Sequence, residues 1–80
     1  MSYFVYVLKS EAYGTRYVGS ALDVQRRLAE HNADRCRYTS GRKPWRLVHQ
    51  EEVLTLSDAR RRENFFKTGQ GRKELDRILF

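Results

Sequence analysis

The segment YVGSALDVQRRLAEHN, residues 17–32, determines the fold that we predict for the rest of the chain. It reads as the end of a strand, a glycine that lets another group approach the backbone closely, and an amphipathic helix. Val24 and Leu28 are expected to form the buried stripe of this helix, with Arg27 and His31 four residues apart at its edge. An arginine and an imidazole directed at one place are typical of an anion site with acid–base capacity.

The pattern around this segment predicts an α/β fold of the α+β type: a three-stranded antiparallel sheet flanked by three helices, in the order β-β-α-β-α-α. Alternating aromatic and β-branched residues predict the strands, and apolar residues at helical spacing predict the helices. Asp23 and Ser57 are expected to cap the first two helices, and Gly69 to end the second. The predicted strands are 3–8, 16–19 and 45–53, and the predicted helices are 24–32, 58–68 and 72–79.

Length and composition restrict the class of protein. Eighty residues allow one domain with one modest core, so we predict a single domain over residues 1–80. Cys36 is the only cysteine, which excludes an intrachain disulfide and a zinc site built from several cysteines and suits the reducing cytoplasm. The sequence has no apolar run of membrane-spanning length and no signal-peptide pattern, so we expect a cytoplasmic protein without membrane attachment.

The charge of the chain indicates a polyanionic partner. Sixteen Lys and Arg residues against ten Asp and Glu give a formal net charge of +6. Aromatic residues are interleaved with the basic ones, which favours nucleic acid. An anionic membrane surface is a weaker fit, because the basic residues are spread over several elements instead of one amphipathic helix. A basic surface that serves solubility alone is the plainer alternative.

Glu63 stands out among the charged residues. Ala59 and Phe66 place it on or beside the inward stripe of its helix, where an unpaired carboxylate is costly. From spacing alone, an ion pair with one of the three arginines at positions 60–62, or a partly exposed flank position, is the simplest explanation. A divalent cation is the alternative, because Mg²⁺ is often held by one or two carboxylates together with waters and phosphates.

Two tyrosines and two basic side chains are open to a structural and a functional interpretation. Tyr6 and Tyr17 lie near the middle of two predicted strands, where most tyrosines serve packing, but antiparallel pairing can place both phenols on one face. A free phenol has a pKa of about 10, so it needs nearby cations to take a proton from water. Arg27 is either a solvated helix residue or a phosphate ligand, and His31 is either a surface histidine or a proton carrier.

In their order and spacing these residues resemble the GIY-YIG nuclease superfamily. The first motif reads Phe-Val-Tyr where the family has Gly-Ile-Tyr, and it keeps the tyrosine. The chain looks closest to the small stand-alone bacterial members, which share a Tyr-Thr pair, a basic stretch before Pro-Trp and an Ala-Arg-Arg-Arg-Glu-like helix. The residues that carry the resemblance are Phe4-Val5-Tyr6, Tyr17-Val18-Gly19, Arg27, His31, Tyr38-Thr39, residues 41–45 and Ala59 to Glu63.

The resemblance implies hydrolysis of DNA phosphodiesters with Mg²⁺ or Mn²⁺. It makes Glu63 the metal ligand, Arg27 the stabiliser of the transition state and Tyr6 the leading candidate for the general base. It also implies that Tyr17 orients water or phosphate, that His31 assists proton transfer or holds a tyrosine, and that Gly19 is structural. Six weaker candidates for nucleic-acid contact are Arg26, Asn32, Tyr38, Thr39, Lys43 and Lys67.

Nothing in the sequence is suited to reading bases, so we expect recognition of phosphates and of DNA shape or strandedness. The favoured function is an endonuclease that cleaves single-stranded, flap or branched DNA in repair or recombination. The alternative is a non-catalytic nucleic-acid-binding module that works with a repair protein, and RNA is a third, weaker candidate ligand. Replacing Glu63 separates the first two, since a nuclease loses cleavage and keeps binding.

Overall fold

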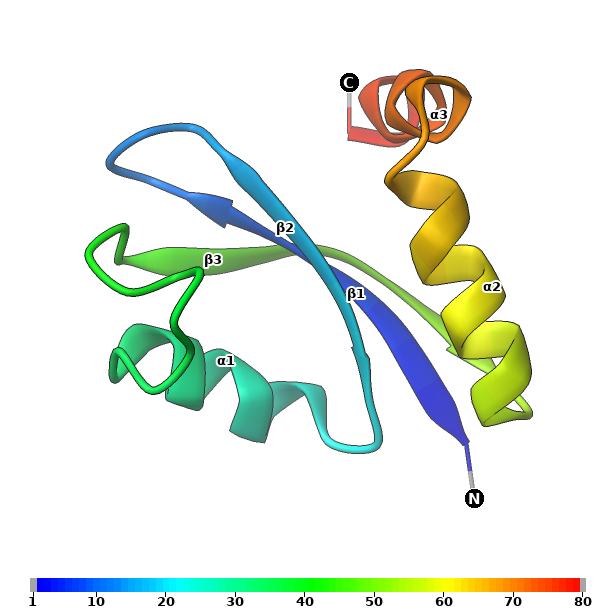
Figure 1. Cartoon of the computed structure of the whole chain (residues 1–80), viewed down its shortest axis with the longest axis horizontal. Coiled ribbons are helices and arrows are strands. Elements are labelled where there is room, and N and C mark those ends of the chain that lie inside the picture. The colour runs from blue at the N-terminus through cyan, green and yellow to red at the C-terminus, as the bar shows by residue number, and fades with distance from the viewer. Residues whose placement is uncertain (1, 80) are drawn as a thin grey trace.

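The computed structural model describes residues 2–79, which form three strands and three helices (Figure 1). The strands make one antiparallel sheet in the order β2-β1-β3, which confirms the predicted α+β architecture. β1 and β2 each extend two residues further than predicted. In chain order the elements are β1 (Tyr3–Ser10), β2 (Arg16–Ala21), α1 (Val24–Asn32), β3 (Trp45–Val53), α2 (Leu56–Phe66) and α3 (Gly69–Leu79).

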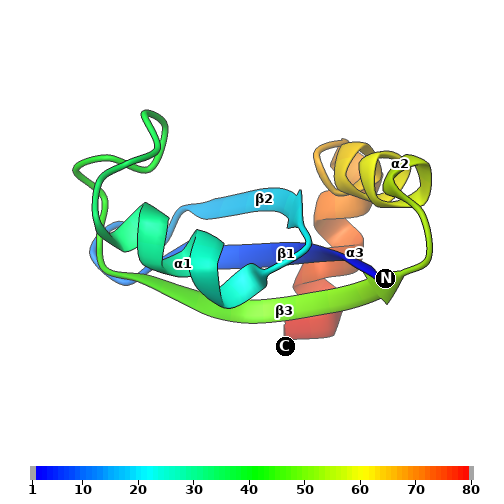
Figure 2. The same cartoon turned by 90° about the horizontal axis from the view of Figure 1, so that it is seen from below.

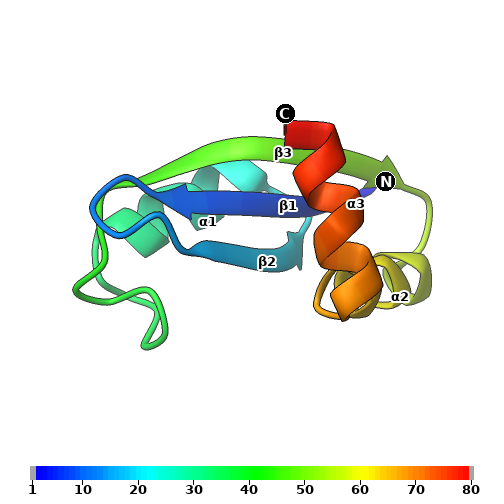
Figure 3. The ribbon, with the colours of Figure 1, turned by 90° about the horizontal axis from the view of Figure 1, so that it is seen from above.

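β1 is the central strand, and both of its faces are buried. Side chains alternate along a strand, so Tyr6 and Leu8 join one apolar cluster, with Val24 of α1. Val5 and Val7 join the other cluster, with residues of α2 and α3. Figures 2 and 3 show the molecule from opposite sides, with α1 on one face of the sheet and α3 on the other. None of the helices within residues 2–79 is long and apolar enough to cross a membrane.

Side-chain caps fix the starts of the first two helices. The Asp23 carboxylate accepts a hydrogen bond from the backbone N–H of Arg26 at 3.1 Å, which confirms the predicted cap of α1. The predicted cap of α2 at Ser57 is wrong. Thr55 caps this helix instead, because its hydroxyl accepts from the backbone N–H of Asp58 at 3.0 Å and so begins the helix one residue after Thr55.

The prediction that Gly69 ends the second helix is also wrong. α2 ends at Phe66, and Gly69 is the first residue of α3. The hydroxyl of Thr68 accepts a hydrogen bond from the backbone N–H of Gly71 at 3.0 Å, which satisfies a donor of the first turn of α3. A Cβ atom on Gly71 would lie 1.8 Å from the carbonyl oxygen of Phe65. Glycine is therefore needed here for close contact between the helices rather than for ending one of them.

Candidate active site

Gly19 makes room for the phenol of Tyr6. The two residues are partners in the register of β1 and β2, and a Cβ atom on Gly19 would lie 2.7 Å from the Tyr6 hydroxyl oxygen. Tyr17 lies on the same face, with its ring centroid 6.2 Å from that of Tyr6. The antiparallel pairing thus gathers both tyrosines on the face that α1 covers.

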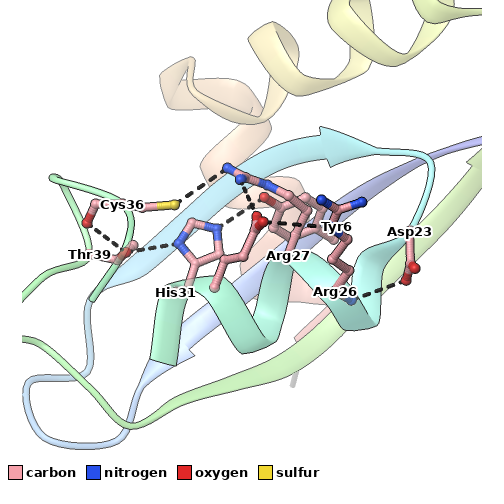
Figure 4. A network of polar contacts seen from close by, with 8 residues as sticks. Tyr6, Asp23, Arg26, Arg27, His31, Cys36 and Thr39 are labelled. Atoms are coloured by element: carbon pink, nitrogen blue, oxygen red, sulfur yellow. Dashed lines mark hydrogen bonds and ion pairs between the residues drawn. The ribbon is translucent and has the colours of Figure 1, made fainter. Parts of the chain in front are cut away.

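A chain of hydrogen bonds runs from Tyr6 into the loop after α1 (Figure 4). The Tyr6 hydroxyl lies 3.1 Å from Nε2 of His31, and Nδ1 of His31 lies 2.8 Å from Oγ1 of Thr39. The Thr39 hydroxyl donates to the carbonyl oxygen of Cys36 at 3.2 Å. Because that hydroxyl has one proton, Nδ1 of His31 must be the donor to Thr39. Nε2 is then an acceptor, and Tyr6 donates to it.

His31 is fully buried, whereas the sequence predicted a position at the edge of the helix stripe. Val24 is the other buried residue of α1, and Leu28 is only half-buried. The imidazole can occupy the interior because both of its nitrogens have partners. The interpretation of His31 as a surface histidine is therefore wrong.

Burial keeps both members of the Tyr6–His31 pair neutral. It raises the pKa of Tyr6 to about 12, although hydrogen bonding from Arg27 acts in the opposite direction. It also lowers the pKa of His31 from its ordinary value of 6.5, and the charge of Arg27 adds to this effect, while Glu30 opposes it. Nearby cations thus do not produce the low phenol pKa that a free tyrosine base would need. In this neutral pair Nε2 of His31 is the group that faces the phenol proton of Tyr6.

The guanidinium of Arg27 lies beside the Tyr6 hydroxyl (Figure 4). Its Nη1 donates to Glu30 at 2.6 Å, and its Nη2 lies 3.5 Å from Sγ of Cys36. Hydrogen bonding to Tyr6, and then to Glu30, raises the pKa of this group above its ordinary value. The side chain is about a third exposed, at 36%. A permanent, oriented and accessible positive charge therefore stands over the Tyr6 hydroxyl.

Glu63 reaches the sheet at the next residue of β2 after Gly19. Its Oε1 accepts from the hydroxyl of Ser20 at 2.9 Å, and its Oε2 pairs with Nζ of Lys67 at 2.8 Å. The expected ion pair with a neighbouring arginine is wrong, because Arg62 instead pairs with Glu51 on β3 at 2.8 Å. A lysine one helical turn further on is within reach of Glu63. The side chain is 21% exposed, which confirms the alternative expectation of a partly exposed flank position.

The chain is similar to a known family over nearly its whole length. The model of the GIY-YIG catalytic domain matches residues 2–75. The chain belongs to the GIY-YIG family. GIY-YIG domains form a nuclease superfamily that binds nucleic acid and generally uses divalent metal ions.

Relatives of this GIY-YIG domain include several UPF0213 proteins. One from Listeria innocua is 44% identical over 78 residues, covering 96% of this chain and 84% of the relative. One from Halobacterium salinarum is 52% identical over 60 residues, covering 74% of this chain and 77% of the relative. The solution NMR structure of a UPF0213 protein from Bacillus halodurans is 31% identical, with a TM-score of 0.59 over 98% of this chain and 85% of that chain. The relatives' names specify no activity.

Four of the six weaker candidates lie on the surface of the GIY-YIG domain. Tyr38 is 57% exposed, and its ring lies 5.7 Å from the Tyr17 ring, centroid to centroid. Arg26 is exposed, Lys43 pairs with Asp34 at 3.0 Å, and Lys67 pairs with Glu63. These side chains are placed where a ligand can reach them.

Asn32 and Thr39 instead serve the interior of the GIY-YIG domain. The Asn32 amide accepts from the backbone N–H of Trp45 at 2.6 Å and donates to its carbonyl oxygen at 3.1 Å. Thr39 is fully buried against His31, and its carbonyl oxygen accepts from the Trp45 indole at 3.0 Å. Both residues were expected to contact nucleic acid. Thr39 has no exposed polar group for such a contact, and the Asn32 amide is already hydrogen-bonded to the backbone of Trp45.

The structure also brings residues to the site that the sequence did not single out. Ser20 holds Glu63, and Cys36 ends the hydrogen-bond chain and contacts Arg27. Arg42 lies over the Tyr38 ring, with Cζ 5.1 Å from its centroid. Of these residues, Ser20 could have been found from the sequence, because it directly follows Gly19. Arg42 belongs to the basic stretch before Pro-Trp, but its contact with Tyr38 depends on how the loop folds back, as does the position of Cys36.

Proposed function

We propose that this GIY-YIG domain is a divalent-metal-dependent DNA endonuclease with little sequence preference, which acts on single-stranded or branched DNA. The observation that carries the proposal is the buried Tyr6–His31–Thr39 chain beside the partly exposed Arg27 guanidinium, because it places a proton acceptor and a phosphate-binding cation at one phenol. Its hydrogen bonds fix the imidazole as a proton acceptor toward Tyr6. Repair or recombination of DNA is the process that such an activity would serve.

In the proposed reaction a water oxygen attacks the phosphorus and the P–O bond to one sugar breaks. The Tyr6 hydroxyl proton passes to Nε2 of His31 as Tyr6 takes a proton from the attacking water. His31 becomes an imidazolium that still donates through Nδ1 to Thr39. Arg27 stabilises the negative charge that grows on the phosphoryl oxygens, and the leaving oxygen takes its proton from solvent.

Glu63 is the residue that fits a divalent metal ion. Within residues 2–79, no three His, Cys, Asp or Glu side chains gather into a group that could hold an ion by themselves. Mg²⁺ and Mn²⁺ do not require such a cage, because one carboxylate with waters and substrate phosphate oxygens is a common set of ligands. Glu63 is partly exposed, and its Oε2 has a single surface lysine, Lys67, as counter-ion. A bound ion would supply neutralisation of the phosphate charge.

The test is a cleavage panel with wild type and Glu63→Gln. We expect wild type to cut single-stranded, flap or four-way DNA with Mg²⁺ or Mn²⁺, and Glu63→Gln to bind without cutting. The matched control is Glu52→Gln, which removes an exposed carboxylate on β3 and should cut like wild type. Cutting by Glu63→Gln at the wild-type rate would contradict the assignment.

A non-catalytic nucleic-acid-binding module is the second candidate function. The observation that favours it is the net charge of +6, since attraction to phosphates requires no proton path. The same panel separates the two functions. Binding of every substrate without cleavage under any metal condition would support the module, acting with a repair protein.

A further inference from the structure

A cleft runs along the outer edge of β2 and has a volume of about 740 Å³, which is within the size range of ligand sites. β2 is an edge strand. Figures 2 and 3 both show the loop after α1 projecting past this edge at one end, with α2 at the other. The cleft is lined by residues 14–18 and Tyr38 on one side, and by Phe66, Lys67, Arg72 and Leu75 on the other.

Three cations surround this cleft and are suited to phosphates. Arg16 pairs with Asp76 at 2.8 Å, and Lys67 pairs with Glu63 at 2.8 Å. Arg72 is exposed and, among the described residues, forms no ion pair. The charge around the cleft is thus positive, and at Arg72 it is not neutralised by a neighbouring carboxylate.

An exposed aromatic ring in the same cleft is suited to the face of a base. Tyr38 is 57% exposed, and Arg42 and Tyr17 lie against its ring, with Cζ of Arg42 5.1 Å from the centroid. Phe66 and Leu75 on the opposite side are each 1% exposed, so Tyr38 is the apolar surface that a base can reach. An aromatic ring next to a guanidinium is a surface on which any of the four bases can stack.

We propose that this cleft binds an unpaired stretch of DNA next to the scissile phosphate, with a base stacked on Tyr38 and phosphates on Arg72 and Lys67. Duplex DNA does not fit this chemistry, because its bases are stacked on one another and cannot reach the tyrosine ring. The cleft also joins the two parts of the candidate active site. Tyr17 lines it and packs on His31, with ring centroids 4.7 Å apart, while Lys67 contacts Glu63.

The inference rests on the proposed function for its substrate, but its test does not need cleavage. Fluorescence anisotropy in EDTA would compare labelled oligothymidine with a duplex of the same length, for wild type, Tyr38→Ala and Tyr38→Phe. Loss of one stacked base predicts that Tyr38→Ala weakens binding of oligothymidine by roughly 5- to 150-fold. Tyr38→Phe should bind it within about twofold of wild type, since stacking requires the ring and not the hydroxyl.

A second variant tests the proposed phosphate ligand. Arg72→Gln should make the slope of log affinity against log salt shallower by about 0.7 for oligothymidine, as expected when one phosphate of a single strand no longer has a cation beside it. Equal binding of oligothymidine by wild type and Tyr38→Ala would overturn the inference, as would equal losses on single strand and duplex. A protein that shows the Tyr38 effect but cleaves nothing would refute the nuclease and leave the cleft intact. A protein that cleaves DNA but binds oligothymidine equally well with and without the Tyr38 ring would refute the cleft and leave the nuclease intact.

Discussion

Replacing Gly19 with alanine tests the close contact on which the candidate active site depends. The new Cβ would lie 2.7 Å from the Tyr6 hydroxyl oxygen and 2.8 Å from its Cζ. Ordinary contact begins at 3.4 Å, so the Tyr6 ring must move by about 0.7 Å. Tyr6 is 1% exposed and its hydroxyl is 3.1 Å from His31, so the ring cannot move without disturbing this hydrogen bond.

Both rate and stability should therefore change in Gly19→Ala. A displacement of this size in a reacting group predicts a fall in cleavage rate of roughly 10- to 100-fold. Overpacking of the core predicts a loss of roughly 1–3 kcal/mol in the free energy of unfolding, or a melting temperature lower by roughly 4–20 °C. Single-turnover cleavage of single-stranded DNA and thermal unfolding followed by circular dichroism measure the two effects.

The matched control is Gly69→Ala, because a Cβ atom on Gly69 meets nothing within 4 Å. This variant should cleave and melt like wild type or slightly above it, since alanine is the better helix former. If Gly19→Ala cleaved at the wild-type rate, the claim that the Tyr6 position controls the reaction would be refuted. Equal losses in both glycine variants would also refute it.

Further predictions concern Gly71, Glu51 and His31. Gly71→Ala should unfold the chain or lower its melting temperature more than any surface variant, because its Cβ would lie 1.8 Å from the Phe65 carbonyl oxygen; an unchanged melting curve would contradict this. Arg62 lowers the pKa of Glu51, so stability should fall as the pH drops below 4.5, and Glu51→Gln should remove that part of the acid slope. The imidazole of His31 should titrate with a midpoint below 6.5 by NMR, since burial lowers its pKa; a midpoint above 6.5 would contradict the buried neutral ring. Because the unfolded chain takes up this proton first, His31 should also reduce stability as the pH falls through 6.5.

The order of the elements could be predicted because each carries a local signal. Asp23 begins its helix with a capping side chain, and the alternation of aromatic and β-branched residues indicates the strand β1. Boundaries that depend on packing could not be predicted. Thr55 and Ser57 are both residues that cap helices, and the sequence does not show which hydroxyl meets the N–H of Asp58. Gly71 lies in a Gly-Gln-Gly segment that is typical of a turn, but in the structure it allows two helices to touch.

The sequence predicts most of the residues of the candidate site, but not how their side chains contact one another. Tyr6 and Tyr17 share a face because antiparallel register follows from alternation. The burial of His31 could not be predicted, since its partner Thr39 comes from an irregular loop whose path has no helical or strand periodicity. The partner of Glu63 was missed because several basic residues lie within reach along one helix, and only the packing of Arg62 against β3 leaves Lys67 as the one that pairs.

Single-turnover cleavage of single-stranded DNA by wild type and Tyr6→Phe, with Mg²⁺ and with EDTA, tests the central claim most directly. We predict that wild type cuts only when the metal is present. We also predict that Tyr6→Phe is slower by at least about 100-fold, as expected when a proton-transfer group is removed, while it still binds the DNA. Circular dichroism would verify that Tyr6→Phe is folded. No cutting by wild type, or cutting by folded Tyr6→Phe at the wild-type rate, would contradict the proposed role of Tyr6 in a metal-dependent nuclease.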